Sequence, residues 1–159
     1  MFELLKKRIK NEKGLSLVEL LAVIVILGIV AAIAIPAIGN IIENSRYNAV
    51  KADGINVINA ANLYFVDNPG AADVTVKQLL DSTFLDTPGK IPSAGKVTKG
   101  TAGSTAGTQN ALTTAAIKYS GDKTVTFNGA TISGINADDK KGSGSGNYTI
   151  GTAPAPSNP

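Results

Sequence analysis

The chain has 159 residues, 43% of them hydrophobic, a formal net charge of +3, and no cysteine or histidine. Without these two residue types it has no disulfide, no zinc site of the usual kind and no Ser-His-Asp or Cys-His nucleophile, so we expect neither enzymatic activity nor a cofactor. The excess charge lies wholly in residues 1–14, where five basic and two acidic side chains give +3. The remaining chain is formally neutral, which argues against a nucleic-acid partner held by electrostatic attraction.

A long apolar stretch follows the basic leader. Residues 20–35 carry no charge and, with the approach from Leu15, form about 30 Å of helix, the thickness of the hydrocarbon core of a bilayer. We expect this helix to span a membrane, with the leader in the cytoplasm. Glu19 lies within the apolar zone, where a charge costs roughly 2.5–3.5 kcal/mol and requires a partner.

Two simpler interpretations of the stretch remain open. A secretory signal peptide would use residues 20–30 as its apolar core and Ala32-Ile33-Ala34 as its cleavage site, but it leaves Glu19 unexplained. An ordinary single-pass anchor needs neither Gly14 nor Glu19. For Glu19 itself, the simpler alternative is a charge at the hydrated start of the helix.

The basic leader, Gly14, Glu19, the apolar helix and Pro36 together resemble the class III signal segment of type IV pilins, competence pilins and pseudopilins. The resemblance covers residues 10–36, with Leu15 where the family usually has phenylalanine. It implies that a prepilin peptidase cleaves between Gly14 and Leu15 and methylates the new N-terminus. It also implies assembly into a homopolymeric filament by a pilus assembly machinery, with Glu19 paired to the N-terminal amine of a neighbouring subunit.

The resemblance further implies an α+β pilin fold in four parts. Residues 1–14 are the cleaved leader, and residues 15–36 are an apolar helix that protrudes as the membrane span and later the filament core. Residues 37–67 are the amphipathic half of the same helix, packed on a small antiparallel sheet. Residues 68–159 form the rest of the head and a flexible C-terminal tail. Many Gram-negative pilins close the C-terminal region with a disulfide, so the lack of cysteine favours a Gram-positive source.

Gly28 and Pro36 are expected to interrupt the helix. Glycine costs about 1 kcal/mol relative to alanine inside a helix, and proline costs about 3 kcal/mol because it removes a donor and clashes with the preceding turn. We expect a continuous or kinked helix in the isolated subunit. In a filament we expect local unwinding between these two residues.

Apolar residues then recur at spacings of three and four, which predicts an amphipathic helix that ends at Asp67-Asn68-Pro69-Gly70. The expected buried stripe consists of Ile38, Ile41, Ile42, Ser45, Ala49, Ala52, Ile55, Ile58, Ala61 and Phe65.

A short second helix is predicted at residues 73–80, capped by Asp73 or Thr75. Residues 87–109 are rich in glycine and proline and are expected to form a loop. The segment from Gly89 to Lys96 does not fit a phosphate-binding loop, because five residues rather than four separate its glycines.

Strands are predicted at residues 112–119, 123–128 and 130–135, with 147–150 as a possible fourth. Asn128-Gly129 is a strong hairpin signal, so the first three are expected to form an antiparallel meander. The candidates for the face that meets the long helix are Ile117, Val125, Phe127 and Ile132. Residues 138–146 are expected to form a flexible, solvated loop, and residues 153–159 an exposed tail.

Three roles are compatible with this organisation: a pilus subunit, a DNA-binding competence pilin and a secretion-system pseudopilin. A DNA-binding tip should be basic and aromatic, whereas the chain after Ile35 has 10 basic and 9 acidic residues, and Tyr148 is the only aromatic residue near its end. Asn147-Tyr148-Thr149 matches a glycosylation acceptor, which is a weak signal at three residues.

Overall fold

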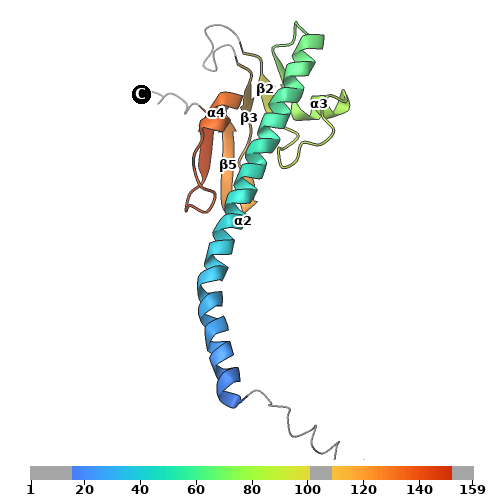
Figure 1. The fold of residues 1–159 in the computed structure, drawn as a ribbon. Coiled ribbons are helices and arrows are strands. Elements are labelled where there is room, and N and C mark those ends of the chain that lie inside the picture. The colour runs from blue at the N-terminus through green and yellow to red at the C-terminus, as the bar shows by residue number, and fades with distance from the viewer. Residues whose placement is uncertain (1–15, 101–108, 152–159) are drawn as a thin grey trace, which may run out of the picture. The chain divides into compact units, whose positions relative to one another are not determined.

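The computed structural model describes residues 16–100 and 109–151 of the chain (Figure 1). Its contacts divide the chain into two compact units, Met1–Gly39 and Asn40–Pro159. Helix α2, Leu17–Asp67, contributes to both units. The predicted leader and the predicted tail at residues 153–159 lie outside the described residues.

In the first unit α2 is apolar on all sides. Its large hydrophobic side chains, from Leu17 to Ile38, are 46–83% exposed. Gly28 and Pro36 both lie inside the helix, which continues through them. The long helix expected for the isolated subunit is therefore confirmed, including its end at Asp67.

In the second unit one face of α2 is buried against the sheets, and the predicted stripe is only partly correct. Ile58, Ala61 and Phe65 are buried as expected, but Ile41 and Ala49 are exposed, as are Ile42, Ser45 and Ala52. Small apolar residues occur on both faces of this helix, so their spacing alone fits two stripes. The face that is buried in the structure consists of Tyr47, Val50, Gly54, Val57, Ile58, Ala60, Ala61 and Phe65.

The first sheet is antiparallel, in the order β1-β2-β3. Its strands are β1 (Asp73–Thr75), β2 (Lys96–Thr98) and β3 (Ala111–Thr113). Val74, Val97 and Leu112 lie opposite one another across the three strands and are fully buried. The predictions of a helix from residue 73 and of an unbroken loop at 87–109 are therefore wrong, because β1 and β2 pair with each other.

Helix α3, Val76–Asp81, begins after β1. Thr75 is its N-cap: the Thr75 hydroxyl accepts from the Gln78 N–H, and the Gln78 side chain accepts from the Thr75 N–H. Of the two predicted caps, Thr75 is the correct one. Leu85, which follows this helix, is buried in the core.

The second sheet has the order β4-β5-β6. Its strands are β4 (Ile117–Ser120), β5 (Lys123–Asn128) and β6 (Tyr148–Gly151). β4 and β5 are antiparallel, but β6 runs parallel to β5. The possible fourth strand is thus present, and the sheet is mixed rather than purely antiparallel.

The third strand of the predicted meander is absent from the described residues. The chain does turn at Gly129, which has a φ of 64°. After this turn, however, Ala130 forms only an isolated antiparallel bridge, and its partner is Leu112 of β3. Residues Ile132–Ala137 form helix α4 instead, because the Thr131 hydroxyl accepts the Gly134 N–H at 3.1 Å and caps it. The hairpin prediction at Asn128-Gly129 is therefore wrong.

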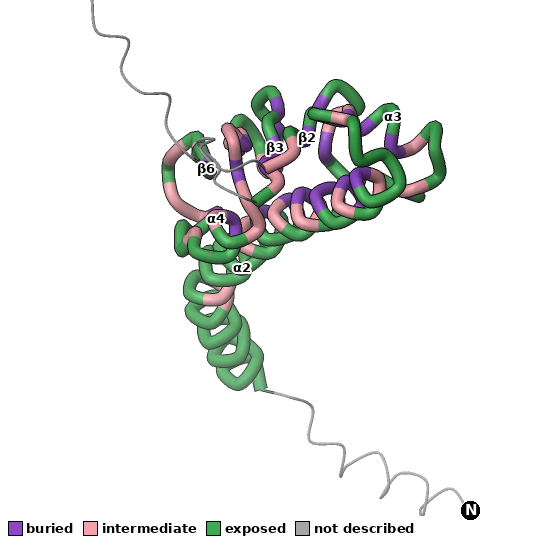
Figure 2. The backbone as a smooth tube through the Cα atoms, turned by 90° about the horizontal axis from the view of Figure 1, so that it is seen from above, coloured by how far each residue is buried: buried purple, intermediate pink, exposed green. Residues whose placement is uncertain are grey.

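The core of the second unit lies between α2 and the two sheets, as the buried positions in Figure 2 show. Ile117, Val125 and Phe127 are buried as predicted, whereas Ile132 is only partly buried because it lies in α4. Gly54 allows this packing, since a Cβ atom there would lie 2.9 Å from Cζ of Phe127.

Candidate processing and assembly site

Ser16 and Glu19 form the start of helix α2. The Ser16 backbone N–H donates to Oε2 of Glu19 at 2.8 Å, and the Glu19 backbone N–H donates to Oγ of Ser16 at 3.2 Å. This reciprocal pair is a capping box, which satisfies two N–H groups that have no partner within the helix. Glu19 also places a negative charge at the positive end of the helix dipole.

Glu19 was predicted from the sequence as a functional residue, whereas Ser16 was not. The missed signal is a serine followed three residues later by a glutamate, just before an apolar run, which is the sequence pattern of a capping box. Ser16 therefore gives Glu19 a role within one chain, in addition to the pairing between subunits that the resemblance implies.

Gly14 and Leu15, the predicted processing residues, lie just outside the described part of the chain. The predicted scissile bond joins them, so Ser16 and Glu19 both lie on its C-terminal side. Cleavage there would leave both partners of the capping box in the mature chain.

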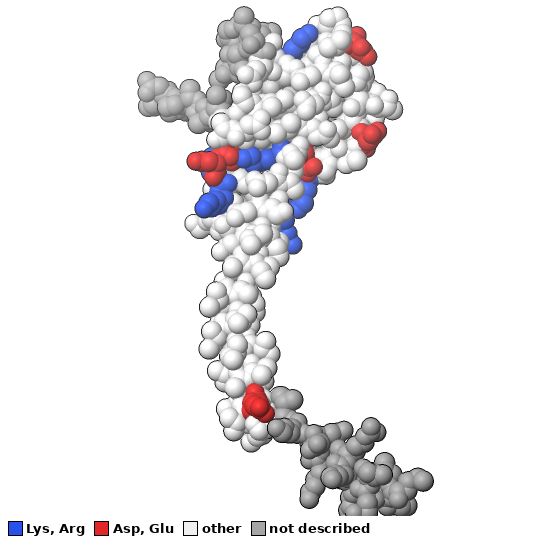
Figure 3. All heavy atoms as spheres, in the orientation of Figure 1, with Lys and Arg blue, Asp and Glu red and all other residues white. Residues whose placement is uncertain are grey.

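The surroundings of Glu19 are apolar. Between Ser16 and Ile42 it is the only charged residue in the chain, and the face of the first unit that Figure 3 shows is uncharged apart from one acidic group. Helix α2 is also long and apolar enough to cross a membrane, by its length and composition. A carboxylate in such a place is costly unless its oxygens are bonded. The other two predicted positions, Gly28 and Pro36, lie further along this helix.

Other features of the described residues offer no comparable site. One open hollow of about 410 Å³ lies beside α4 and β6, and Asp138 and Lys140 are the only charged residues that line it. Within residues 16–100 and 109–151, no three His, Cys, Asp or Glu side chains are placed to hold a metal ion.

The fold and the helix start together define the class of the protein. It is an α+β protein in which a long N-terminal helix, apolar in its first half, precedes small sheets, as in the pilin fold. Residues 9–35 match the family model of the prokaryotic N-terminal methylation motif. The chain therefore carries the methylation motif of a prepilin signal segment, the kind of segment that a prepilin peptidase processes, and its α+β architecture is consistent with the pilin fold.

No curated protein and no solved structure matches the chain. The family match covers only the end of the predicted leader, from residue 9, and the apolar part of the helix to residue 35. It does not test the expected Gram-positive source, which stays a prediction.

Proposed function

We propose that the chain is a structural subunit of a type IV or type IV-like pilus. The observation that carries this proposal is the methylation motif at residues 9–35, which contains Glu19 at the capped start of an apolar helix. The motif supports cleavage after Gly14 and N-methylation of Leu15. The exposed apolar side chains of α2 support polymerisation, because such a surface requires lipid or further copies of the helix to cover it.

In this proposal the four predicted parts act in sequence. The precursor is held in the cell membrane by residues 15–36, with residues 1–14 in the cytoplasm and residues 37–159 outside. A prepilin peptidase removes the leader, and the assembly machinery then transfers the apolar helix from lipid to the core of a homopolymeric filament at the cell surface. Residues 37–67 and 68–159 form the head that the filament displays.

Glu19 has one carboxylate oxygen engaged within its own chain. Oε2 accepts the Ser16 N–H, whereas Oε1 has no hydrogen-bond partner among the described residues. Cleavage would create a positively charged amine at Leu15. In the proposed filament Oε1 pairs with this amine on a neighbouring subunit, which offsets the cost of burying both charges and sets the register of the incoming subunit.

Three variants separate the pairing role from the capping role. Glu19→Gln keeps an oxygen that can accept the Ser16 N–H but removes the charge. Ser16→Ala removes the hydroxyl that caps the helix but keeps the charge, and Glu19→Ala removes both the charge and the oxygen that accepts the Ser16 N–H. The measurements are N-terminal mass spectrometry for processing and electron microscopy of sheared cells for filaments.

All three variants should be cleaved, only Ser16→Ala should assemble well, and Glu19→Gln should be about as defective as Glu19→Ala. Normal filaments from Glu19→Gln would contradict the pairing role. If Ser16→Ala were as defective as Glu19→Ala while Glu19→Gln assembled, Glu19 would act as a cap only.

Gly14 is the proposed recognition residue for cleavage. Gly14→Leu should leave full-length protein in the membrane and no filaments, because a side chain at this position would obstruct the peptidase. Ser16→Ala, which changes a nearby residue beyond the scissile bond, is the matched control and should be cleaved normally. Efficient cleavage of Gly14→Leu would overturn the proposed processing site.

The segment between Gly28 and Pro36 is proposed to unwind in the filament. The helix of the subunit is continuous there, and it contains one residue of poor helix propensity and one without a backbone donor. A filament map with an unbroken helix from Val25 to Ile38 would exclude unwinding.

A DNA-uptake pilin and a secretion-system pseudopilin are the alternatives. The ion pairs of the head give DNA binding little support, since six of its lysines lie within 4.0 Å of a carboxylate: Lys51, Lys77, Lys96, Lys118, Lys123 and Lys140. A salt-dependent DNA mobility shift would favour uptake, and a protein scarce at the cell surface would favour a pseudopilin.

A further inference from the structure

Residues 138–151, here called the C-terminal arm, are attached to the second unit mainly by polar contacts. Ile150 is the only hydrophobic side chain of the arm that is buried, and Tyr148 is partly buried. By contrast, α2 alone contributes seven buried hydrophobic side chains to the same core. A segment with few buried apolar contacts is the kind that opens locally while the rest of a domain stays folded.

Asp138 joins the start of the arm to α2. Its side chain is 3% exposed, and its Oδ2 accepts the Tyr47 hydroxyl at 2.7 Å and lies 3.3 Å from Nζ of Lys51. Nζ of Lys51 also donates to the Asp138 backbone oxygen at 2.6 Å, and Lys140 donates to Oδ1. The buried Asp138 carboxylate thus accepts hydrogen bonds from three side chains, two of which belong to α2.

The backbone of the arm is attached in the same manner. The Tyr119 hydroxyl donates to the Gly142 oxygen at 3.1 Å, and the Ser143 N–H donates to Oδ1 of Asn44 at 2.9 Å. Within the arm itself, the Tyr148 hydroxyl donates to the Lys141 oxygen at 2.9 Å. These bonds explain why the segment does not form the freely solvated loop that its Gly/Ser composition predicts.

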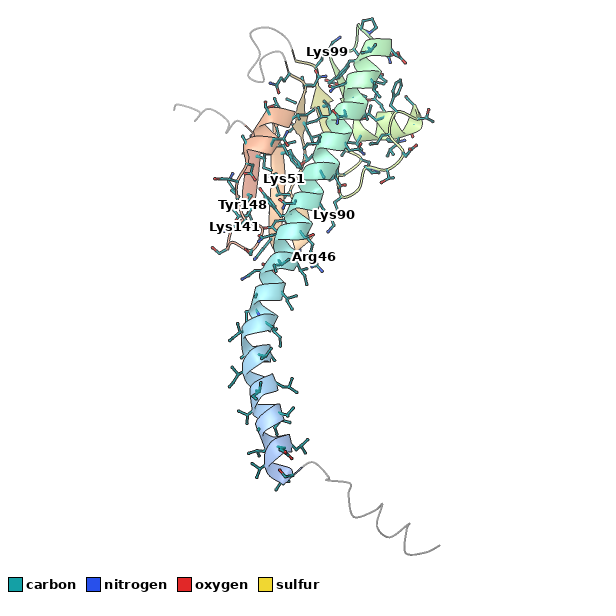
Figure 4. The ribbon with its side chains drawn as sticks, viewed as in Figure 1. Arg46, Lys51, Lys90, Lys99, Lys141 and Tyr148 are labelled. Atoms are coloured by element: carbon teal, nitrogen blue, oxygen red, sulfur yellow. The ribbon has the colours of Figure 1, made fainter. Side chains whose placement is uncertain are left out.

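Gly142 places the arm directly on the helix. A Cβ atom at Gly142 would lie 2.5 Å from the Glu43 backbone oxygen and 2.5 Å from Cβ of Tyr47, so no larger residue fits there without movement. The Tyr47 ring lies 5.3 Å from the Tyr148 ring, and Figure 4 shows Tyr148 and Lys141 beside the part of α2 that carries Lys51.

The arm ends in β6, which pairs with β5 at the edge of its sheet. Among the described strands β6 has no second neighbour, so it can leave without breaking the pairing of β4 with β5. Release of the arm would therefore expose one edge of β5 while most of the core stays in place.

We propose that the C-terminal arm is a strap that opens as a separate unit and is fastened to α2 chiefly by Asp138. It closes the end of the head noncovalently, in a chain that has no cysteine for a disulfide. The strap opens before the domain unfolds, so the arm is the first part of the head to become accessible to a protease. This behaviour does not depend on whether the chain polymerises.

Trypsin provides a direct test, because Lys140 and Lys141 lie inside the arm and Lys118 lies in β4. The full chain in detergent micelles is digested briefly, and the rate of cutting at each lysine is measured by mass spectrometry. Asp138→Asn should raise cutting at Lys140 and Lys141 about tenfold or more, since it removes the charge that pairs with the partly buried Lys51. Cutting at Lys118 should change much less.

Two controls distinguish local opening from general destabilisation. Asp81→Asn makes the same chemical change in an exposed ion pair with Lys77 and should leave the cutting pattern unchanged. Leu79→Ala removes a fully buried side chain away from the arm and should raise cutting at Lys118 and in the arm together. Unchanged cutting in the arm of Asp138→Asn, or a rise that matches that at Lys118, would overturn the proposal.

Discussion

Helix α2 contains two regions that differ in how the rest of the chain covers their apolar side chains. In the first unit its large apolar side chains are exposed on every side, whereas in the second unit a single stripe is buried against two sheets. A helix that is apolar all round requires an apolar environment from outside the chain, and a helix with one apolar stripe supplies half of a domain core. Helix α2 thus combines a segment whose apolar side chains the chain itself does not cover with a segment that forms part of a domain core.

The two regions should differ most in how an isoleucine-to-alanine substitution changes the free energy of unfolding. Ile58 is 1% exposed in the second unit, and Ile33 is 71% exposed in the first. Ile58→Ala should reduce the free energy of unfolding of the second unit by about 2–5 kcal/mol, because it leaves a cavity. Ile33→Ala should leave that free energy unchanged. Urea denaturation followed by tyrosine fluorescence measures both, and equal losses would contradict the division into two regions.

Alanine substitutions at Gly28 and Gly54 of α2 should differ by a smaller amount in their effect on the free energy of unfolding. A Cβ at Gly54 would meet Phe127 at 2.9 Å, whereas a Cβ at Gly28 would meet no atom within 4 Å. Gly54→Ala should therefore destabilise the second unit by about 1–3 kcal/mol through overpacking. Gly28→Ala should strengthen the helix locally by about 1 kcal/mol and leave the unfolding of the second unit unchanged. A Gly54→Ala protein as stable as the original would show that Phe127 can move aside.

The smallest effect is expected from mild acid, and it should be confined to the second unit. Burial alone would raise the pKa of Asp138, but hydrogen bonds from Lys140, Tyr47 and Lys51 outweigh burial and hold the pKa below its usual range. The hydrogen bond from Lys123 likewise lowers the pKa of Glu43.

Both carboxylates therefore contribute stability above the pKa that they have in the unfolded chain, about 4, and this contribution is lost as the pH falls through their lower folded values. Unfolding free energies should be nearly constant from pH 7 to pH 5 and then decrease. Asp138→Asn should flatten the decrease. An equally steep decrease in that variant would show that other groups control the acid response.

The sequence predicted the long helix, its end and most of the strand positions, because these features depend on local patterns such as the apolar run and the Asp67-Asn68-Pro69-Gly70 stop. It did not predict which helix face is buried, since the small residues of α2 fit two stripes. It also missed β1 and β2 and placed a strand over α4, where the Thr131 cap and the pairing of Ala130 with Leu112 decide the outcome.

The candidate site, like the fold, was predicted only in part. Gly14, Leu15 and Glu19 were predicted from the motif. Ser16 could also have been predicted, because a serine three residues before Glu19 is the pattern of a capping box, and its hydrogen bonds show that role. The attachment of the C-terminal arm was not predictable from composition, because it depends on residues of α2 and β4 that are distant in the sequence, among them Tyr47, Lys51 and Tyr119.

The most direct test of the pilin role is mass spectrometry of the N-terminus of the protein in filaments sheared from the cell surface. The account predicts filaments composed of this chain, beginning at Leu15 with a methylated amino group. A surface protein that still begins at Met1, or one that begins after Ala34 as a secretory signal peptide would leave it, would contradict the account.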